Sequence, residues 1–301
     1  MKQNVKLLLV ILAGALSFLG CVKTLTTDTT LTADFNGEVK IAADSITLDC
    51  DGHVITGSGS GNGIKLVSRT GVTIMNCEVT NFDDGIQVNG SNNNVFTNNV
   101  THNNVQEGFD IENSDQNTFT TNTSRDNGVS GFSIASSTSN TFTSNLVHNN
   151  TQEGFNIDDS NNNTFTENTS RDNTRDGFDL GDSDDNDFIG NVVTGNATNG
   201  IELDSCNANT LSGNVVSNNL NHGFSLDLST GNTLDGNTSN DNIDIGFRIK
   251  TNSNNNTISN NNANGNGDND AEQDNGLTNT FCGNTFGTVD NDVPAGYANP
   301  C

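Results

Sequence analysis

Large apolar residues recur along the middle of the chain at a constant interval. Each follows a glycine, and successive glycines are 23 residues apart. A second apolar residue stands eleven positions after most of these glycines. A fixed period of this kind predicts a solenoid, in which each unit buries its apolar face by stacking on its neighbours. The glycine pairs are Gly85-Ile86, Gly108-Phe109, Gly131-Phe132, Gly154-Phe155, Gly177-Phe178, Gly200-Ile201, Gly223-Phe224 and Gly246-Phe247, and the second column is Phe96, Phe119, Phe142, Phe165, Phe188, Leu211 and Leu234.

The spacing inside one unit predicts short β-strands. After Gly108, Phe109 and Ile111 are two residues apart, and Phe119 stands alone between threonines. Such fragments end at Asn, Gly, Asp or Ser, which favours strands joined by turns. No segment contains a ten-residue run with helical spacing. Three short strands per unit predict an all-β, single-stranded parallel β-helix with neighbouring coils ~4.8 Å apart.

Asparagines recur with the same 23-residue period, at nine, fourteen and nineteen positions after the glycines. Asn tolerates the left-handed backbone conformation of tight corners, and its amide both donates and accepts hydrogen bonds. We therefore expect stacked asparagines that bond from coil to coil and satisfy buried backbone groups. The middle column consists of Asn99, Asn122, Asn145, Asn168, Asn191, Asn214 and Asn237.

Three segments carry a family resemblance: "ITLDCDGHVITG" at residues 46–57, "GVTIMNC" at residues 71–77 and "GFNIDDSNNNTFTENTSRDN" at residues 154–173. They resemble the right-handed parallel β-helix repeats of the NosD-like and carbohydrate-associated β-helix families, over about residues 31–287. The resemblance implies a right-handed coil. It implies no single activity, because hydrolases, lyases, epimerases and non-catalytic surface proteins share this scaffold.

The ends of the chain depart from the repeat. Residues 1–21 combine two early lysines with a short apolar run, which predicts an export signal. Cys21 could instead carry a lipid anchor. We expect an N-terminal cap and first coil at 22–62, regular coils at 63–269, and a degenerate last coil with a C-terminal cap at 270–301. Either signal predicts a secreted, periplasmic or cell-surface protein, with a membrane contact only through a lipid at Cys21.

Charge and cysteines narrow the set of partners. The chain has 37 acidic and 11 basic residues, a net charge of −26, and no basic cluster. It is therefore a poor match for nucleic acid, which requires basic patches. Export makes a disulfide between Cys50 and Cys77 plausible, with buried reduced thiols as the alternative, and another could close the tail between Cys282 and Cys301. Cys206 replaces a serine in a serine column, which favours a packing role.

A basic column stands seventeen positions after the glycines. It contains His102, Arg125, His148 and Arg171. It is a candidate catalytic row for a lyase or epimerase on an anionic sugar, with nearby acidic residues as further ligands of the sugar. The alternative is that each Arg pairs with the Asp beside it on a solvated face. The acidic ligand candidates are Asp126, Asp172, Glu107 and Glu153.

A second column is acidic and follows the strand that begins at each glycine. Its members are Asp158, Asp182, Asp204 and Asp227, with Asp179 and Glu202 close by. Stacked carboxylates could bind Ca²⁺ or act as the acid and the nucleophile or base of a glycosidase. The alternative is a solvated acidic wall. We expect no other cofactor, because His, Cys and Met form no cluster that would suit copper.

These patterns predict a module that binds a polysaccharide or cell-surface glycan without catalysis. The first alternative is an enzyme on acidic glycans, either a lyase or epimerase using the His/Arg column or a hydrolase using the Asp column. The second alternative is a structural adhesin without a sugar ligand.

Overall fold

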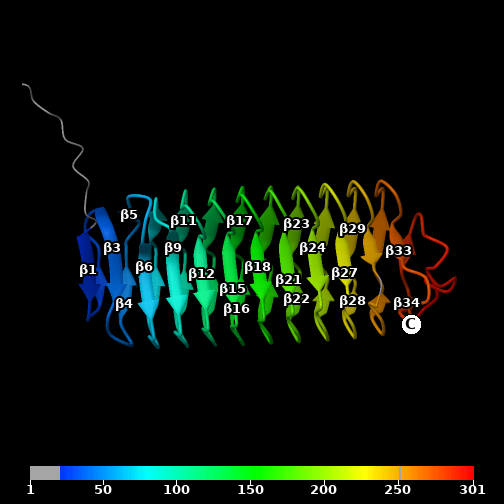
Figure 1. Cartoon of the computed structure of the whole chain (residues 1–301), viewed down its shortest axis with the longest axis horizontal. Coiled ribbons are helices and arrows are strands. Elements are labelled where there is room, and N and C mark those ends of the chain that lie inside the picture. Colours follow the sequence, from blue (N-terminus) through cyan, green and yellow to red (C-terminus); the bar gives the residue numbers. More distant parts are fainter. Residues whose placement is uncertain (1–20, 251) are drawn as a thin grey trace, which may run out of the picture.

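The computed structural model describes residues 21–250 and 252–301. These residues form a right-handed parallel β-helix, elongated along the stacking axis (Figure 1). Every strand pairs in parallel with the equivalent strand of the next coil. The prediction of an all-β solenoid with three strands per coil is confirmed. The expected export signal lies largely outside the described residues.

Three sheets run the length of the body, and we number them in the order in which the chain enters them after each glycine. Sheet 1 contains β1 (Cys21–Leu25), β3 (Phe35–Ile41), β6 (Asn62–Val67), β9 (Asp84–Asn89), β12 (Phe109–Glu112), β15 (Phe132–Ala135), β18 (Phe155–Asp158), β21 (Phe178–Gly181), β24 (Ile201–Asp204), β27 (Phe224–Asp227), β30 (Phe247–Ile249) and β33 (Ala271–Gln273).

Sheet 2 follows sheet 1 around each coil. It contains β2 (Thr29–Thr30), β4 (Thr47–Asp49), β7 (Thr73–Met75), β10 (Val95–Thr97), β13 (Thr118–Thr120), β16 (Thr141–Thr143), β19 (Thr164–Thr166), β22 (Asp187–Ile189), β25 (Thr210–Ser212), β28 (Thr233–Asp235), β31 (Thr257–Ser259) and β34 (Thr280–Cys282).

Sheet 3 closes the coil and joins sheet 1 through β3, which pairs with both β5 and β6. It contains β5 (Val54–Thr56), β8 (Glu78–Thr80), β11 (Val100–His102), β14 (Thr123–Arg125), β17 (Leu146–His148), β20 (Thr169–Arg171), β23 (Val192–Thr194), β26 (Val215–Ser217), β29 (Thr238–Asn240), β32 (Asn262–Asn264) and β35 (Thr285–Phe286).

Phenylalanine stacks fill the centre of the coil. The sheet 2 stack runs through Phe96, Phe119, Phe142, Phe165 and Phe188, with ring centroids 4.6–4.8 Å apart and rings almost parallel. The phenylalanines of sheet 1 meet these rings edge-on, an arrangement that aromatic pairs favour. Each apolar column of the sequence is therefore one buried stack.

The recurring glycines have a steric purpose. A Cβ atom at Gly131 would lie 2.3 Å from Cγ1 of Val147 on sheet 3 and 2.8 Å from the carbonyl oxygen of Gly154. These glycines lack the positive φ that often explains a glycine. They are needed because the chain enters sheet 1 in close contact with the side chains of sheet 3.

The expected asparagine ladder is present, and its members are buried. Asn145 Nδ2 donates to Oδ1 of Asn168 at 2.9 Å and to the carbonyl oxygen of Phe119 at 2.9 Å, while its backbone N–H also bonds Asn168. The predicted reason for these columns was partly wrong. The left-handed conformation belongs to the residue before each ladder asparagine, such as Asn98 or Ser144, rather than to the ladder residue itself.

Disulfides join Cys50 to Cys77 and Cys282 to Cys301. Cys206 is buried in the serine column, where its thiol donates to the carbonyl oxygen of Asp204 at 3.2 Å. Burial raises the pKa of that thiol to about 12, which keeps it protonated. Among the described residues there is no helix long and apolar enough to cross a membrane.

Candidate functional site on sheet 1

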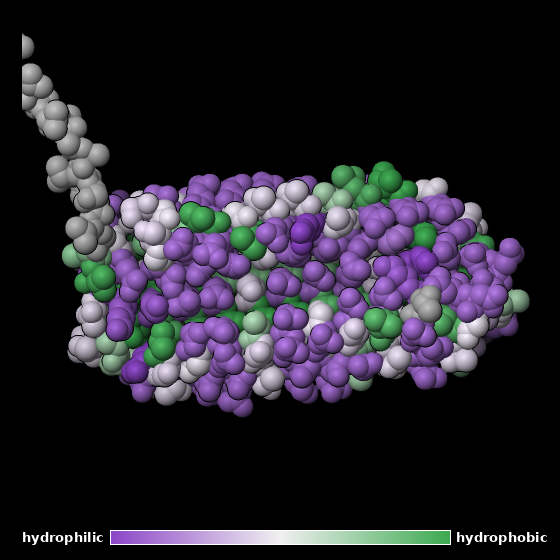
Figure 2. Space-filling view, in the orientation of Figure 1, coloured by the Kyte–Doolittle hydropathy of each residue, from purple (hydrophilic) through white to green (hydrophobic). Residues whose placement is uncertain are grey.

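The outer face of sheet 1 carries most of the buried acidic side chains of the described residues. Two rows point away from the core, one just before each glycine and one two residues after it. In the view of Figure 2 the surface is mostly hydrophilic. The first row reads Asp84, Glu107, Ser130, Glu153, Asp176, Asn199 and His222, and the second reads Lys40, Lys65, Gln87, Asp110, Ser133, Asn156, Asp179, Glu202, Ser225, Arg248 and Glu272.

Four carboxyl groups on neighbouring coils form what we call the central cluster, which consists of Glu153, Asp176, Asp179 and Glu202. The strand register places Asp179 beside Glu202, on β21 and β24. Glu153 and Asp176 are only 4% and 7% exposed. The cluster is therefore partly withdrawn from water, which makes ionisation of its members costly.

Hydrogen bonds fix two members of the central cluster, Asp176 and Glu202. Asp176 accepts from the hydroxyl of Thr198 and from the backbone N–H of Asn199, both at 2.7 Å. The amide of Asn199 donates to Glu202 at 2.6 Å. These contacts fix the positions of Asp176, on the same coil as Asp179, and of Glu202, on the next coil.

Two cations stand at the margins of the central cluster. Arg175 contacts Glu153 at 3.0 Å, and Glu153 also accepts from the hydroxyl of Ser130 at 3.0 Å. Lys250 reaches Glu202 at 3.8 Å. Asp179 has no cationic partner at ion-pair distance among the described residues.

The electrostatics follow from this arrangement. Burial, and then the neighbouring Asp176 and Glu202 carboxylates, raise the pKa of Asp179 to about 7. Burial also raises the pKa of Asp176 and of Glu202, while hydrogen bonds act against the shift in both cases. Asp179 can therefore hold a proton near neutral pH and deliver it to a bound group.

A second acidic group, the N-terminal cluster, lies on β9, β12 and the turn between β11 and β12. Burial, and then a hydrogen bond to Asp84, raise the pKa of Glu107 to about 8. Burial raises the pKa of Asp110 to about 6, although Gln87 donates to it at 3.2 Å. Burial raises the pKa of Asp84 too, and its Oδ1 accepts no hydrogen bond from any N–H or hydroxyl donor of the described residues.

The acidic column expected from the sequence is two rows in the structure. Asp158, Gly181, Asp204 and Asp227 share one row at the end of the sheet 1 strands. Asp182 falls one residue beyond that row, in an exposed turn with positive φ. Of the four candidates, only Asp204 and Asp227 therefore occupy neighbouring places.

The predicted basic column is a true row, but on sheet 3. His102, Arg125, His148 and Arg171 are aligned on β11, β14, β17 and β20. Arg125 pairs with Asp126 at 2.7 Å, and Arg171 pairs with Asp172. This is the local pairing given above as the alternative, so the guanidinium groups already have anionic partners.

The histidines of that row differ in their surroundings. His102 Nε2 contacts Glu78 at 2.9 Å. Burial, and then the Arg171 guanidinium, lower the pKa of His148, whose Nδ1 is buried and lacks a hydrogen-bond partner within the described residues. Glu107 and Glu153, the expected ligands of the same sugar, lie around the corner at the edge of sheet 1. The structure thus separates the two groups.

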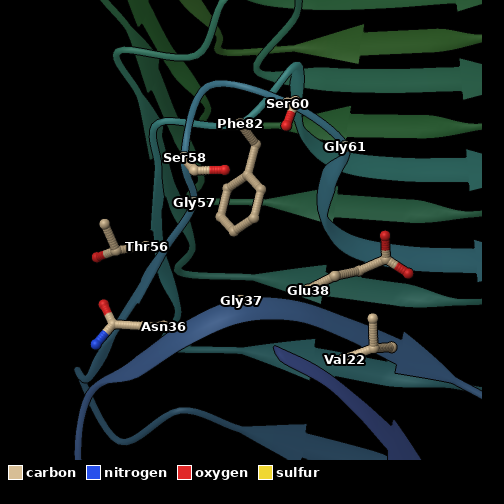
Figure 3. A pocket seen from close by; sticks show the side chains of 10 residues that line it. All are labelled: Val22, Asn36, Gly37, Glu38, Thr56, Gly57, Ser58, Ser60, Gly61 and Phe82. Atoms are coloured by element: carbon tan, nitrogen blue, oxygen red, sulfur yellow. The ribbon is translucent and has the colours of Figure 1, made fainter. Parts of the chain in front are cut away.

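A pocket of about 410 Å³ lies at the N-terminal end of the body. Figure 3 shows the Phe82 side chain beneath the loop of Gly57, Ser58 and Ser60, with Glu38 and Val22 on the opposite side. Glu38 is the only carboxylate of its lining, so the pocket is distinct from both acidic clusters.

The family model described as "Periplasmic copper-binding protein (NosD)" matches residues 40–209 and 158–299. The chain belongs to the NosD family. A comparison with curated protein sequences finds no match.

Solved structures show the fold that this NosD-family chain shares. The A-module of mannuronan C-5 epimerase AlgE4 from Azotobacter vinelandii has a TM-score of 0.69 at 17% identity, covering 93% of this chain and 88% of that one. The AlgE6 A-module of the same organism has a TM-score of 0.68 at 16% identity, covering 88% and 84%. Pectate lyase Pel9A has a TM-score of 0.50 at 17% identity, covering 90% and 68%.

The copper named in the family description does not fit the side chains present. The described residues contain no group of three or more His, Cys, Asp or Glu side chains that could hold a metal ion. His102 and His148 are separated by the Arg125 strand, and four of the six cysteines are in disulfides. Asp158, Asp182, Asp204 and Asp227, the calcium candidates, belong to no such group within the described part of the chain.

Sequence reasoning missed Asp84, Asp110 and Asp176 as members of the acidic clusters, and Arg175 as the cation beside Glu153. The signal was available, because Asp176 stands directly before a glycine and Asp110 two residues after one. The residues just before each glycine and those two positions after it lie on the same face of sheet 1. The acidic clusters can therefore be recognised only when both columns are followed together.

Proposed function

We propose that this NosD-family protein is an exported glycoside hydrolase that acts on an uncharged polysaccharide at the central cluster. The observation that carries the proposal is Asp179, a partly buried carboxyl group with a pKa of about 7, flanked by two other carboxyl groups. A glycosidase needs one carboxylic acid that is still protonated at working pH and a second carboxylate close to it.

In this mechanism Asp179 donates its proton to the glycosidic oxygen as the bond to the leaving sugar breaks. We assign Glu202 as the ionised partner: burial raises its pKa, but the Asn199 amide and Lys250 both act against that shift. Glu202 stabilises or attacks the sugar cation that forms. Afterwards a water molecule gives its proton to Asp179 and its oxygen to the sugar.

The stereochemical outcome follows from the register. Asp179 and Glu202 are partners on adjacent strands, whose backbones are ~4.8 Å apart. Retaining glycosidases hold their two carboxyl groups about 5–5.5 Å apart, whereas inverting enzymes leave room for a water between them. Adjacent strands therefore favour retention of configuration.

Charge selects the class of polymer. The central cluster contains four carboxyl groups against two marginal cations, and the protein has a net charge of −26. A uronate chain would be repelled from this face, and the arginines of sheet 3 are already paired. We therefore propose a neutral substrate in place of the acidic one predicted from the sequence.

Export is part of the same proposal. The family description and two disulfides support an oxidising compartment outside the cytoplasm. The predicted export signal at residues 1–21 agrees with this placement. Free secretion and a lipid anchor at Cys21 remain distinguishable by mass measurement of the mature N-terminus.

The test is a panel of neutral glucans, xylans and mannans beside uronate polymers, with release of reducing ends as the readout. We expect turnover of a neutral polymer, and Asp179→Asn should lower kcat by about 100-fold or more, as expected for loss of a general acid. Asp182→Asn is the matched control, because that side chain is exposed and lies outside the cluster.

The proposal also predicts the shape of the pH profile. The rate should fall on the alkaline side as Asp179 loses its proton, with a midpoint near pH 7 set by its pKa of about 7. Binding of a glycan without turnover would support the non-catalytic module instead. Turnover confined to uronate polymers would refute the neutral substrate.

A further inference from the structure

The outer face of sheet 2 differs from the rest of the surface because it is built of threonines. Three successive coils present the same Thr-Phe-Thr strand, with Phe inside and both threonines outside. The strand register aligns them in two rows. We call these six residues the threonine array: Thr118, Thr120, Thr141, Thr143, Thr164 and Thr166.

The array is straight and evenly spaced, as the rings beneath it demonstrate. From Phe96 to Phe188 the centroids of successive rings are 4.6, 4.8, 4.7 and 4.7 Å apart. The ring planes differ by only 5–6° from one coil to the next. Neighbouring coils are thus translated with almost no rotation, although β-strands in most sheets twist markedly relative to one another.

The hydroxyl groups of the array are available to bind something outside the protein. Each of its threonines is half-buried at its base, and none of the six hydroxyls has a hydrogen-bond partner among residues 21–250 and 252–301. Elsewhere threonine hydroxyls are used internally, as in Thr198, which donates to Asp176. The array therefore presents a lattice of free donors and acceptors, with a methyl group beside each one.

The outward strand positions around the threonine array carry no charge. Between Asp49 and Asp187, no outward position of a sheet 2 strand carries a charged side chain. The whole chain has 37 acidic residues, and sheet 1 of the same coils is densely acidic. Strand propensity alone explains threonine but not this exclusion of charge, since outward positions of sheets accept charged residues readily.

We propose that the threonine array binds ice. Its hydroxyls repeat every ~4.7 Å along the axis and every ~6.7 Å across it, since the two threonines of one strand are two residues apart. Both distances are comparable with repeats of oxygen atoms on faces of hexagonal ice. Hydroxyls can anchor water in these positions, while the flanking methyl groups and the lack of charge leave the anchored layer undisturbed.

The ligand is an ordered water lattice rather than a sugar for two reasons. The array has no aromatic side chain on its outer side, although aromatic faces are the usual platforms for sugar rings. It also lacks the bidentate or charged groups that orient a single small ligand. Its hydroxyl groups repeat in two dimensions, and only a ligand with a periodic surface can bind all of them at once. The inference concerns a different face from the proposed glycosidase and does not depend on it.

The experiment measures thermal hysteresis and inhibition of ice recrystallisation by the purified protein. We expect both activities, together with faceted ice crystals. Thr143→Lys should abolish them, because it places a charge in the centre of the array. Thr141→Val combined with Thr143→Val should weaken them while keeping the strand shape. Thr169→Lys, an outward threonine on β20 of sheet 3, is the matched control and should retain them.

Circular dichroism of each variant separates loss of ice binding from loss of the fold. Folded wild-type protein without hysteresis or recrystallisation inhibition would overturn the proposal. So would an effect of Thr169→Lys equal to that of Thr143→Lys. Binding to crystalline cellulose or chitin that Thr143→Lys removes, without any effect on ice, would assign the array to a solid polysaccharide instead.

Discussion

Sheets 1 and 2 belong to the same coils, yet their outer faces have opposite chemistry. On sheet 1 the outward rows are acidic, partly buried and joined by hydrogen bonds, and three of their carboxyl groups have a pKa between about 6 and about 8. On β13, β16 and β19 of sheet 2 the outward residues are threonines whose hydroxyls bond to no described residue, and none of these positions is charged. Both sheets contribute stacked phenylalanines to the core of these coils.

The difference shows that in this solenoid the chemistry of the outer surface varies independently of the frame, by which we mean the paired strands and their buried side chains. Strand pairing, phenyl stacks and asparagine ladders fix where each outward residue stands, whatever that residue is. Outward positions are then free to differ between faces. The predictions below separate effects on the shared frame from effects on one face.

The largest effect is expected from the shared core. Phe142 is fully buried, stacks on Phe119 and Phe165 at 4.8 and 4.7 Å, and meets Phe132 edge-on. Phe142→Ala should lower the free energy of unfolding by about 3–5 kcal/mol, because it leaves a cavity in a close-packed stack. Chemical denaturation followed by circular dichroism measures it.

Phe142→Leu is the control, since leucine fills the same column at Leu211 and Leu234. Phe142→Leu should lower the free energy of unfolding clearly less than Phe142→Ala does. If Phe142→Ala impaired only one face, measured through ice activity and hydrolysis, the two faces would not share one frame.

A smaller effect on the same frame is expected from the ladder. Asn145→Ala removes the side-chain bonds to Asn168 and to the carbonyl oxygen of Phe119, and leaves the N–H of Asn122 without its acceptor. Unsatisfied buried groups cost about 1–3 kcal/mol each, so a loss of roughly 2–4 kcal/mol is expected. Hydrogen exchange should show the greatest loss of protection at the coils beside Asn145. Uniform loss along the whole body would contradict a ladder that acts locally.

The frame could be predicted from the sequence because it repeats. The glycine, phenylalanine and asparagine columns each correspond to one buried row, and the two disulfides join cysteines close to equivalent corners or to the tail. The error over left-handed residues has a physical cause. At the corner, Ser144 has a positive φ and Asn145 directs its amide inward. A column of asparagines in the sequence does not show that these two roles belong to adjacent residues.

The candidate site was less predictable because it does not repeat. The column from His102 to Arg171 can be read from the sequence. The ion pair between Arg125 and Asp126 can be seen only in the structure. The central cluster draws on residues before and after the glycine, and its chemistry depends on how deeply Asp176 and Asp179 are buried. Burial of an outward side chain depends on the shape of the neighbouring turn. The repeating sequence columns do not predict that shape.

The pH dependence of stability should distinguish the two faces. Glu107 has a pKa near 4.3 when unfolded and about 8 when folded, so the folded state holds its proton over that interval. The free energy of unfolding should therefore decrease as pH rises from about 4 to about 8 and then level off, because the unfolded state binds fewer protons. Thermal melts between pH 4 and pH 9 give this curve.

Glu107→Gln should flatten the curve by removing its main contributor. Glu167→Gln makes the same change in net charge at an exposed position beside sheet 2 and serves as the control. Equal flattening by both variants would mean that general repulsion among the acidic residues, rather than burial on sheet 1, determines the pH dependence.

The smallest effect should come from sheet 2. The hydroxyl of Thr143 bonds to no described residue, so Thr143→Val removes no internal contact and keeps a β-branched side chain. Its free energy of unfolding should change by less than about 0.5 kcal/mol, at any pH between 4 and 9. A larger loss would show that the threonine hydroxyls stabilise the strands, in which case the regular array would be a structural feature of the frame and sheet 2 would resemble sheet 1 more than its surface suggests.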